Sequence, residues 1–193
     1  MIFTIERKIF LREYAEDLYT TLPYYLAKQI IEFPLQIIIA STTAIMVYFA
    51  LGLLFVAANF FTFFFIIFSL VIAGSSMGYL LGTLFTQPNA ANLVTAQILM
   101  PLGILAGFYS NINSVPVWFS WLQYVSPIRY ALEAVVWNEF ADFDDENGTI
   151  PNPIEYLNYR LGLWECIGCL WGLSVVFRIV SYFLFKRYAE ANK

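Results

Sequence analysis

The stretch that decides the fold is FFTFFFIIFSLVIAGSSMGYLLGTLF, residues 60–85, whose 26 residues include no charged side chain. A helix rises about 1.5 Å per residue, and roughly 20 apolar residues are enough to cross the hydrocarbon core of a bilayer. We therefore expect residues 60–85 to form a membrane-spanning helix.

The rest of the chain has the same character. Of its 193 residues, 60% are hydrophobic, 19% are aromatic and only 12% are charged, which is far from the average soluble domain. Further apolar runs lie at residues 24–54, 92–109 and 163–185. The sequence predicts an all-α polytopic membrane protein with four transmembrane helices within a domain of residues 24–185.

Charge is segregated along the chain, and this predicts its topology. Lysine and arginine gather near both ends, whereas the acidic residues cluster between Glu133 and Glu165. By the positive-inside rule, both termini and the tail at 186–193 face the cytoplasm, and the loop at 110–162 faces outward. We expect a multi-pass protein of the plasma membrane or an endomembrane. No basic patch indicates a nucleic-acid partner.

Residues 1–23 predict an amphipathic helix at the cytoplasmic interface. At 100° per residue, Phe10 and Tyr14 fall on one side, and Glu6 and Glu13 fall largely on the other. Two interpretations fit this pattern: an ordinary solvated juxtamembrane helix, or a docking surface for a soluble partner domain.

Three charged residues lie within the predicted spans. Lys28 and Glu32 are four residues apart on one helical face, just before Pro34, and Arg178 lies about two turns from the end of the last span. The charges can anchor the helices by reaching the headgroups, or they can form a network with neighbouring helices, since ionisable residues within a bilayer usually face protein.

Small residues mark two of the spans. Gly74, Gly78 and Gly82 recur every four residues, a period that lets another helix approach closely, and we favour packing inside one subunit over a dimer seam. Pro101 and Gly103 make residues 92–109 the least regular span. Such a span either lines a transport path or contains a packing kink.

The segment at 107–139 combines aromatic residues with Pro116 and Pro127, then turns amphipathic with Arg129 and Glu133. Non-helical backbone at membrane depth is tolerated only where protein or water satisfies it. We interpret this segment as a re-entrant extracellular hairpin that precedes the last span.

Two short motifs carry less weight. Asn147-Gly148-Thr149 is an N-glycosylation acceptor if its loop reaches the secretory lumen. Cys166 and Cys169 are spaced C-x-x-C, but there is no second pair and the chain contains no histidine, so we expect no metal site.

Taken together, the motifs resemble the membrane domain of the G subfamily of ABC transporters, the White and breast-cancer-resistance type, within the ABC-2 permease class. The matching segments are ERKIFLREY (6–14), YLAK (25–28) with Glu32 and Pro34, Gly107-Phe108 with Asn111, residues 116–121 with Tyr124, Ser126-Pro127 with Tyr130, Asn138-Glu139-Phe140, and Phe177-Arg178-Ile179.

The resemblance implies specific roles for these segments. In that family a half-transporter has an ATP-binding domain and six spans, and this chain looks like the last four spans. Its start would be the coupling helix that touches the ATPase, with the contributing residues Glu6, Arg12, Glu13 and Tyr14. Lys28, Glu32 and Arg178 would form the intramembrane charge network.

The resemblance also implies a transport path. The third span would line the substrate cavity with Ala96, Met100 and Gly103. The gate would be formed by the next segment, at Gly107, Phe108, Tyr109 and Asn111. Some relatives carry a pair of leucines where this chain has Phe108 and Tyr109. Its outer loop lacks cysteines, so no intersubunit disulfide is expected there.

The resemblance predicts the permease portion of an ATP-driven exporter of lipids, sterols or amphipathic small molecules, working by alternating access as a homodimer or heterodimer. The chain contains no phosphate-binding loop, so it should not hydrolyse ATP itself, and ATP and Mg would be bound by a separate nucleotide-binding domain. One alternative is a truncated or structural four-span protein that dimerises without transporting. Another is a passive channel, although no span carries a ring of like charges.

Overall fold

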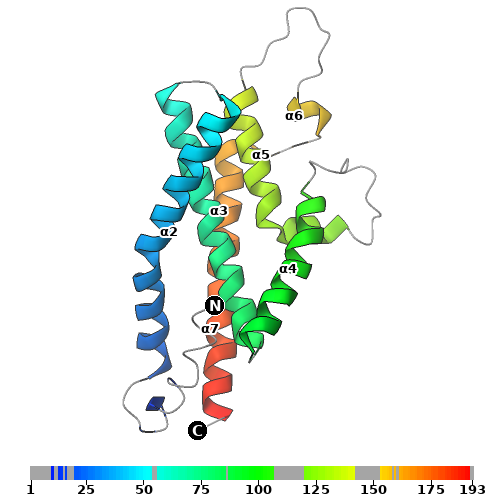
Figure 1. The fold of residues 1–193 in the computed structure, drawn as a ribbon. Coiled ribbons are helices and arrows are strands. Elements are labelled where there is room, and N and C mark those ends of the chain that lie inside the picture. The colour runs from blue at the N-terminus through cyan, green and yellow to red at the C-terminus, as the bar shows by residue number, and fades with distance from the viewer. Residues whose placement is uncertain are drawn as a thin grey trace, which may run out of the picture.

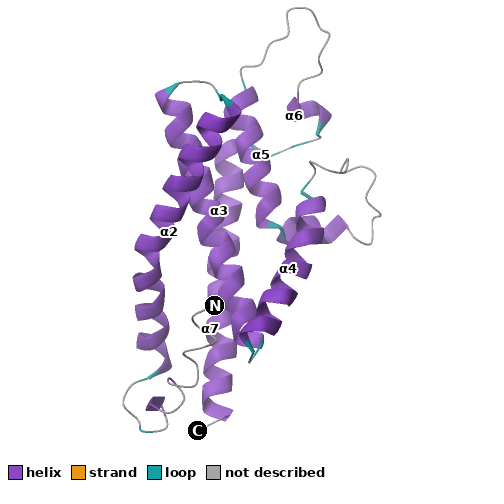
Figure 2. Cartoon of the chain, in the orientation of Figure 1, coloured by secondary structure: helices purple, strands orange, loops and turns teal. Residues whose placement is uncertain are grey.

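The computed structural model describes residues 10, 13–14, 16, 20–53, 56–85, 87–106, 120–141, 153–157, 159 and 161–191. Throughout these ranges the regular structure is helical (Figures 1 and 2). The elements in chain order are α2 (Thr21–Leu51), α3 (Ala57–Leu84), α4 (Pro88–Ile104), the 3-10 helix η2 (Ser120–Val125), α5 (Pro127–Phe140), α6 (Pro153–Tyr156) and α7 (Leu163–Ala191).

Three helices are long and apolar enough to cross a membrane: α2 with 31 residues, α3 with 28 and α7 with 29. They run side by side along the length of the molecule (Figure 1). The prediction of an all-helical membrane protein is confirmed. The helix α4 has 17 residues, about 25 Å at 1.5 Å per residue, which is shorter than a hydrocarbon core of roughly 30 Å. A fourth span therefore stays a prediction.

Two helices extend beyond the spans that the sequence analysis assigned. The helix α2 begins at Thr21 rather than at residue 24, because Pro23 lies in its first turn, where the missing N–H costs no hydrogen bond. The helix α7 continues to Ala191, so residues that we assigned to a cytoplasmic tail at 186–193 are helical. Lys186 and Glu190 form an exposed i,i+4 pair there, and this pairing supports the extra turn.

A single glycine ends α2. Gly52 has φ 63°, in the left-handed region that other residues rarely adopt, and its N–H donates to the Tyr48 carbonyl. The chain can then turn back at once into α3, which begins at Ala57.

The main core lies where α3, α5 and α7 meet. Its centre consists of small or branched side chains that are almost fully buried: Ile66, Ala73, Ala131, Ala134, Cys166, Ile167 and Leu170. Because alanines occupy the crossing points, the helix backbones come close together, as small residues allow in membranes. The Trp171 indole N–H also donates to the Ser69 hydroxyl across the α3–α7 contact, at 3.2 Å.

The glycine row of α3 is not the helix seam that we expected at two of its three positions. Among the described residues, a β-carbon added at Gly74 or Gly78 would meet nothing within 4 Å, whereas Gly82 is buried. The neighbouring residues Ala73 and Ser76 face the core instead.

The segment after α4 returns to the bundle. In Figure 1, α5 starts about halfway along the molecule, beside the end of α4, and runs along α3 and α7 to the upper end. Ser126 caps α5 and Pro127 occupies its first position, which is why the helix begins there. The depth of this segment in a bilayer, and so its re-entrant character, stays a prediction.

Candidate functional site

An aromatic cluster, the Phe10 cluster, packs Phe10 against the start of α2 and the end of α7. Phe10 is only 1% exposed. Its ring centroid lies 4.5 Å from that of Tyr24 at the start of α2, and 4.8 Å from that of Phe185 near the end of α7. A displacement of Phe10 would therefore act on α2 and α7 together.

The predicted coupling residues can be placed only in part. Glu13 and Tyr14 are helical and half-buried, and the Tyr14 ring stacks on Phe10 at 5.6 Å. Glu6 and Arg12 lie outside the described residues. The coupling role of this segment stays a prediction.

Arg178 joins the three long helices at one level. Its Nε donates to the Ser76 hydroxyl on α3 at 2.9 Å, and its backbone carbonyl accepts from the Tyr25 hydroxyl on α2 at 3.0 Å. Arg178 therefore bonds to both α2 and α3.

The other two predicted intramembrane charges lie on α2. Glu32 is half-buried on this helix. Lys28 is half-buried one turn earlier. A network among all three charges stays a prediction.

The Arg178–Ser76 bond can be tested directly. We expect Ser76→Ala to lower the free energy of unfolding by about 1 kcal/mol, because it removes the buried acceptor of a charged donor. Thermal unfolding of the purified protein in detergent would measure the loss. Ser75→Ala is the control, since the Ser75 hydroxyl accepts from Gln36 and not from Arg178. If Ser76→Ala lowered the free energy of unfolding by the same amount in a protein that already carries Arg178→Ala, the pairing of Arg178 with Ser76 would be contradicted.

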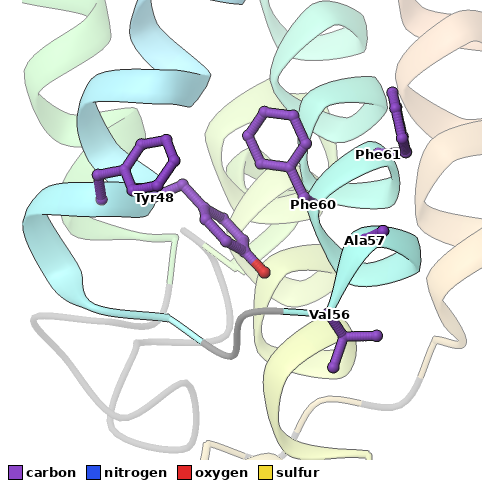
Figure 3. A pocket seen from close by; sticks show the side chains of 6 residues that line it. Tyr48, Val56, Ala57, Phe60 and Phe61 are labelled. Carbon is purple, nitrogen blue, oxygen red and sulfur yellow. The ribbon is translucent and has the colours of Figure 1, made fainter.

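Open apolar hollows lie along the surface of α2, including one near each end of the helix. One, of about 380 Å³, is lined by Leu26, Gln29, Ile30, Phe33, Pro34 and Arg178. The other, of about 240 Å³, lies at the α2–α3 link and is shown in Figure 3; its lining residues are Tyr48, Phe49, Val56, Ala57, Phe60 and Phe61. Both offer apolar contact, and neither brings together groups for covalent chemistry.

The predicted cavity residues do not share one environment. Ala96 and Met100 are exposed on α4, with Met100 73% exposed. Gly103 is half-buried and faces α5, where a β-carbon would lie 3.8 Å from Cδ1 of Ile128. The described part of this chain therefore leaves the face of α4 that carries Ala96 and Met100 uncovered, and the role of this face in a cavity stays a prediction.

The predicted gate and the glycosylation acceptor lie outside the described residues. These positions are Gly107, Phe108, Tyr109, Asn111 and Asn147. In the described part of the chain, α4 ends at Ile104 and a turn follows at residues 105–106.

The structure reveals a buried charge pair that our choice of site residues missed. Arg129 Nε lies 3.9 Å from Glu133 Oε2 on α5, and their side chains are 9% and 0% exposed. The guanidinium also lies over the Tyr124 ring, 5.1 Å from its centroid. Its signal in the sequence is an i,i+4 charge pair in a largely apolar helix, shortly after Ser126-Pro127.

Hydroxyl groups around this pair hold the end of α4. The Ser126 hydroxyl donates to the Leu102 carbonyl at 3.1 Å and accepts from the backbone N–H of Arg129 at 3.4 Å. The Tyr159 hydroxyl donates to the Ala106 carbonyl at 3.1 Å. Burial, together with the nearby Glu133 carboxylate, raises the pKa of Tyr159 to about 12, so the phenol remains a donor at neutral pH.

Glu133 also reaches the segment that precedes α7. Its Oε1 accepts from the backbone N–H of Leu161 at 2.8 Å. One buried carboxylate thus links α5 to the chain just before the last span.

Comparison with known proteins assigns the chain to a family. The family model described as ABC-2 type transporter matches residues 1–140, which include Phe10, α2, α3, α4 and α5. The chain belongs to the ABC-2 type transporter family. It is therefore the membrane portion of a transporter.

Relatives of this ABC-2 domain include two proteins named white. The chain is 33% identical to that of Ceratitis capitata over 94% of its own length, and 29% identical to that of Drosophila melanogaster over its full length. It is also 29% identical to ABC transporter G family member 1 of Dictyostelium discoideum, over 92% of its length. The chain spans 28%, 30% and 25% of the lengths of these three relatives.

The ABC-2 assignment gives the geometry a context. No group of three or more metal-binding side chains comes together within the described ranges, and Cys166 and Cys169 are free thiols, buried and half-buried.

Proposed function

We propose that this chain is the permease portion of an ATP-driven exporter that moves lipids, sterols or other amphipathic molecules by alternating access. The match of residues 1–140 to the ABC-2 type transporter family carries the proposal. Relatives named as members of the G family support it.

The energy for transport would come from a nucleotide-binding domain that binds ATP and Mg. The segment at residues 1–23 would receive it, and the burial of Phe10 between Tyr24 and Phe185 supports this role, because one contact would act on two spans. Dimerisation with another half-transporter, identical or not, would complete the path. The exposed face of α4 with Ala96 and Met100 is available to line it.

The test is ATP-dependent movement of a lipid in proteoliposomes. The transporter that contains this chain would be reconstituted into phosphatidylcholine vesicles with a fluorescently labelled phosphatidylcholine, and the labelled lipid accessible to a membrane-impermeant quencher would be measured with ATP and with ADP. ATP-dependent redistribution supports the proposal. A stable dimer that hydrolyses ATP but moves no labelled lipid or sterol would instead favour a membrane protein that assembles without transporting.

The gate makes a sharper prediction. We expect the double change Phe108→Ala and Tyr109→Ala to lower the amount of lipid moved per ATP hydrolysed, because two bulky side chains would no longer separate the inner and outer cavities. ATP hydrolysis itself should continue. Val115→Ala in the same segment is the control, and an unchanged ratio in the double variant would contradict a gate at these positions.

A further inference from the structure

The end of α4 is held by side chains from two distant parts of the chain. The last carbonyls of a helix have no partner within the helix and must find one elsewhere when buried. Here the Leu102 carbonyl accepts from Ser126, 24 residues later, and the Ala106 carbonyl accepts from Tyr159, 53 residues later. Both bonds are buried, so water does not replace them readily.

Glu133 connects the two holding points. It lies two turns after Ser126 on α5, and its Oε1 accepts from the N–H of Leu161, two residues after Tyr159. Its other oxygen faces Arg129 at 3.9 Å. The beginning of α5 and the segment before α7 are therefore tied to each other as well as to α4.

We propose that Ser126, Glu133 and Tyr159 form a clasp that makes the end of α4 move together with α5 and the start of α7 during the transport cycle. The proposal rests on the proposed function, since it assigns these three residues to positioning within that transporter. Ser126 and Tyr159 act through the carbonyls of Leu102 and Ala106, and Glu133 acts through the N–H of Leu161, so their proposed role is positioning and not substrate contact.

The clasp gives α7 a route to the transport path. The Phe10 cluster reaches the far end of α7 through Phe185, and α7 begins right after the segment that Glu133 and Tyr159 hold. The predicted gate residues at 107–111 follow α4 directly in the sequence. A shift of α7 would therefore be transmitted to the residue from which the gate segment continues.

The chain offers a closely matched pair of variants. Tyr159→Phe removes the hydroxyl that donates to Ala106 at 3.1 Å, whereas Tyr130→Phe removes one that donates to Tyr124 at the same distance and does not reach α4. Each change deletes one phenol-to-carbonyl bond, so each should lower thermal stability by a similar amount. Only Tyr159→Phe should release α4.

The first readout follows the end of α4. Ile104, in the last turn of α4, is 46% exposed, and Ile104→Cys would be labelled with a maleimide in detergent, with the protein lacking this change as the blank for Cys166 and Cys169. We expect Tyr159→Phe to raise the labelling rate by about threefold to tenfold, the range that loss of one buried hydrogen bond allows. Tyr130→Phe should leave the rate unchanged.

The second readout is the amount of labelled phosphatidylcholine moved per ATP hydrolysed in proteoliposomes. Tyr159→Phe and Ser126→Ala should lower it by a similar factor, Ser126→Thr should restore it because the hydroxyl returns, and Tyr130→Phe should not change it. Equal labelling rates for the two tyrosine variants would overturn the clasp, and a changed labelling rate with an unchanged ratio would overturn its role in transport. If the unaltered transporter moves no lipid, the proposed function fails, while the labelling rates still decide whether the clasp exists.

Discussion

Replacing Glu133 with alanine is expected to lower the free energy of unfolding by about 3–5 kcal/mol, the usual cost of removing one partner from a buried ion pair. The Glu133 side chain is fully buried, and Arg129 would be left with a charge that neither water nor a carboxylate compensates. The bond to the N–H of Leu161 would be lost as well. Thermal and denaturant-induced unfolding in detergent would measure the effect.

The last helix supplies a control with the same spacing and nearly the same distance. Lys186 and Glu190 are also an i,i+4 pair, with 3.8 Å between Nζ and Oε1, but their side chains are 49% and 54% exposed. Glu190→Ala should cost less than about 0.5 kcal/mol, because exposed pairs contribute little. The double change Arg129→Met with Glu133→Leu should recover part of the loss, since no charge is then left buried. Equal effects of Glu133→Ala and Glu190→Ala would contradict the burial of the α5 pair.

The second large effect is expected where α3 meets α5 and α7. Ala73→Leu should destabilise the protein by about 1–3 kcal/mol or more, because Ala73 is fully buried in the core cluster and a larger side chain would force the helices apart. Thermal unfolding would show it as a lower midpoint temperature.

The neighbouring residue is the matched control. Gly74→Leu introduces the same side chain one position further along the same helix and adds even more volume, but a β-carbon there meets nothing within 4 Å in the described part of the chain. It should be tolerated, and the better helix propensity of leucine should even favour α3. If Gly74→Leu were as damaging as Ala73→Leu, the glycine row would have to pack against a segment or copy other than the described part of this chain.

The long helices were predictable because a run of apolar residues is a local property. The segment at 60–85 has no charge to interrupt it, and α3 forms at Ala57–Leu84, within three residues of the prediction at each end. The errors arose at residues with two possible roles. Pro23 can end one helix or start another, and Lys186-Arg187 can leave a membrane without leaving a helix.

The buried pair was not predictable in the same way, since its burial depends on distant segments. An arginine and a glutamate four residues apart usually indicate a solvated helix face. Whether Arg129 and Glu133 face water depends on α3 and α7, which cover α5, and the spacing within α5 contains no information about them. The packing of the glycine row was not predictable for the same reason. The period of the glycines shows only that another helix can approach α3, and the fold shows that α5 and α7 approach it at Ala73 instead.

The position of α7 has a consequence for how the protein is made. The residues that complete the core, Cys166 and Leu170, belong to α7, which is synthesised after α3 and α5, so this core cannot close until α7 has been made. Before α7 is made, α3 lies in the lipid without the hydrogen bonds from Trp171 to Ser69 and from Arg178 to Ser76. Both hydroxyls donate to carbonyls one turn earlier in α3, Ser69 to Phe65 at 2.8 Å and Ser76 to Ile72 at 2.7 Å. Each hydroxyl oxygen can still accept a hydrogen bond. The nascent helix α3 can therefore be stable alone in the membrane and still accept from Trp171 and Arg178 once α7 is present.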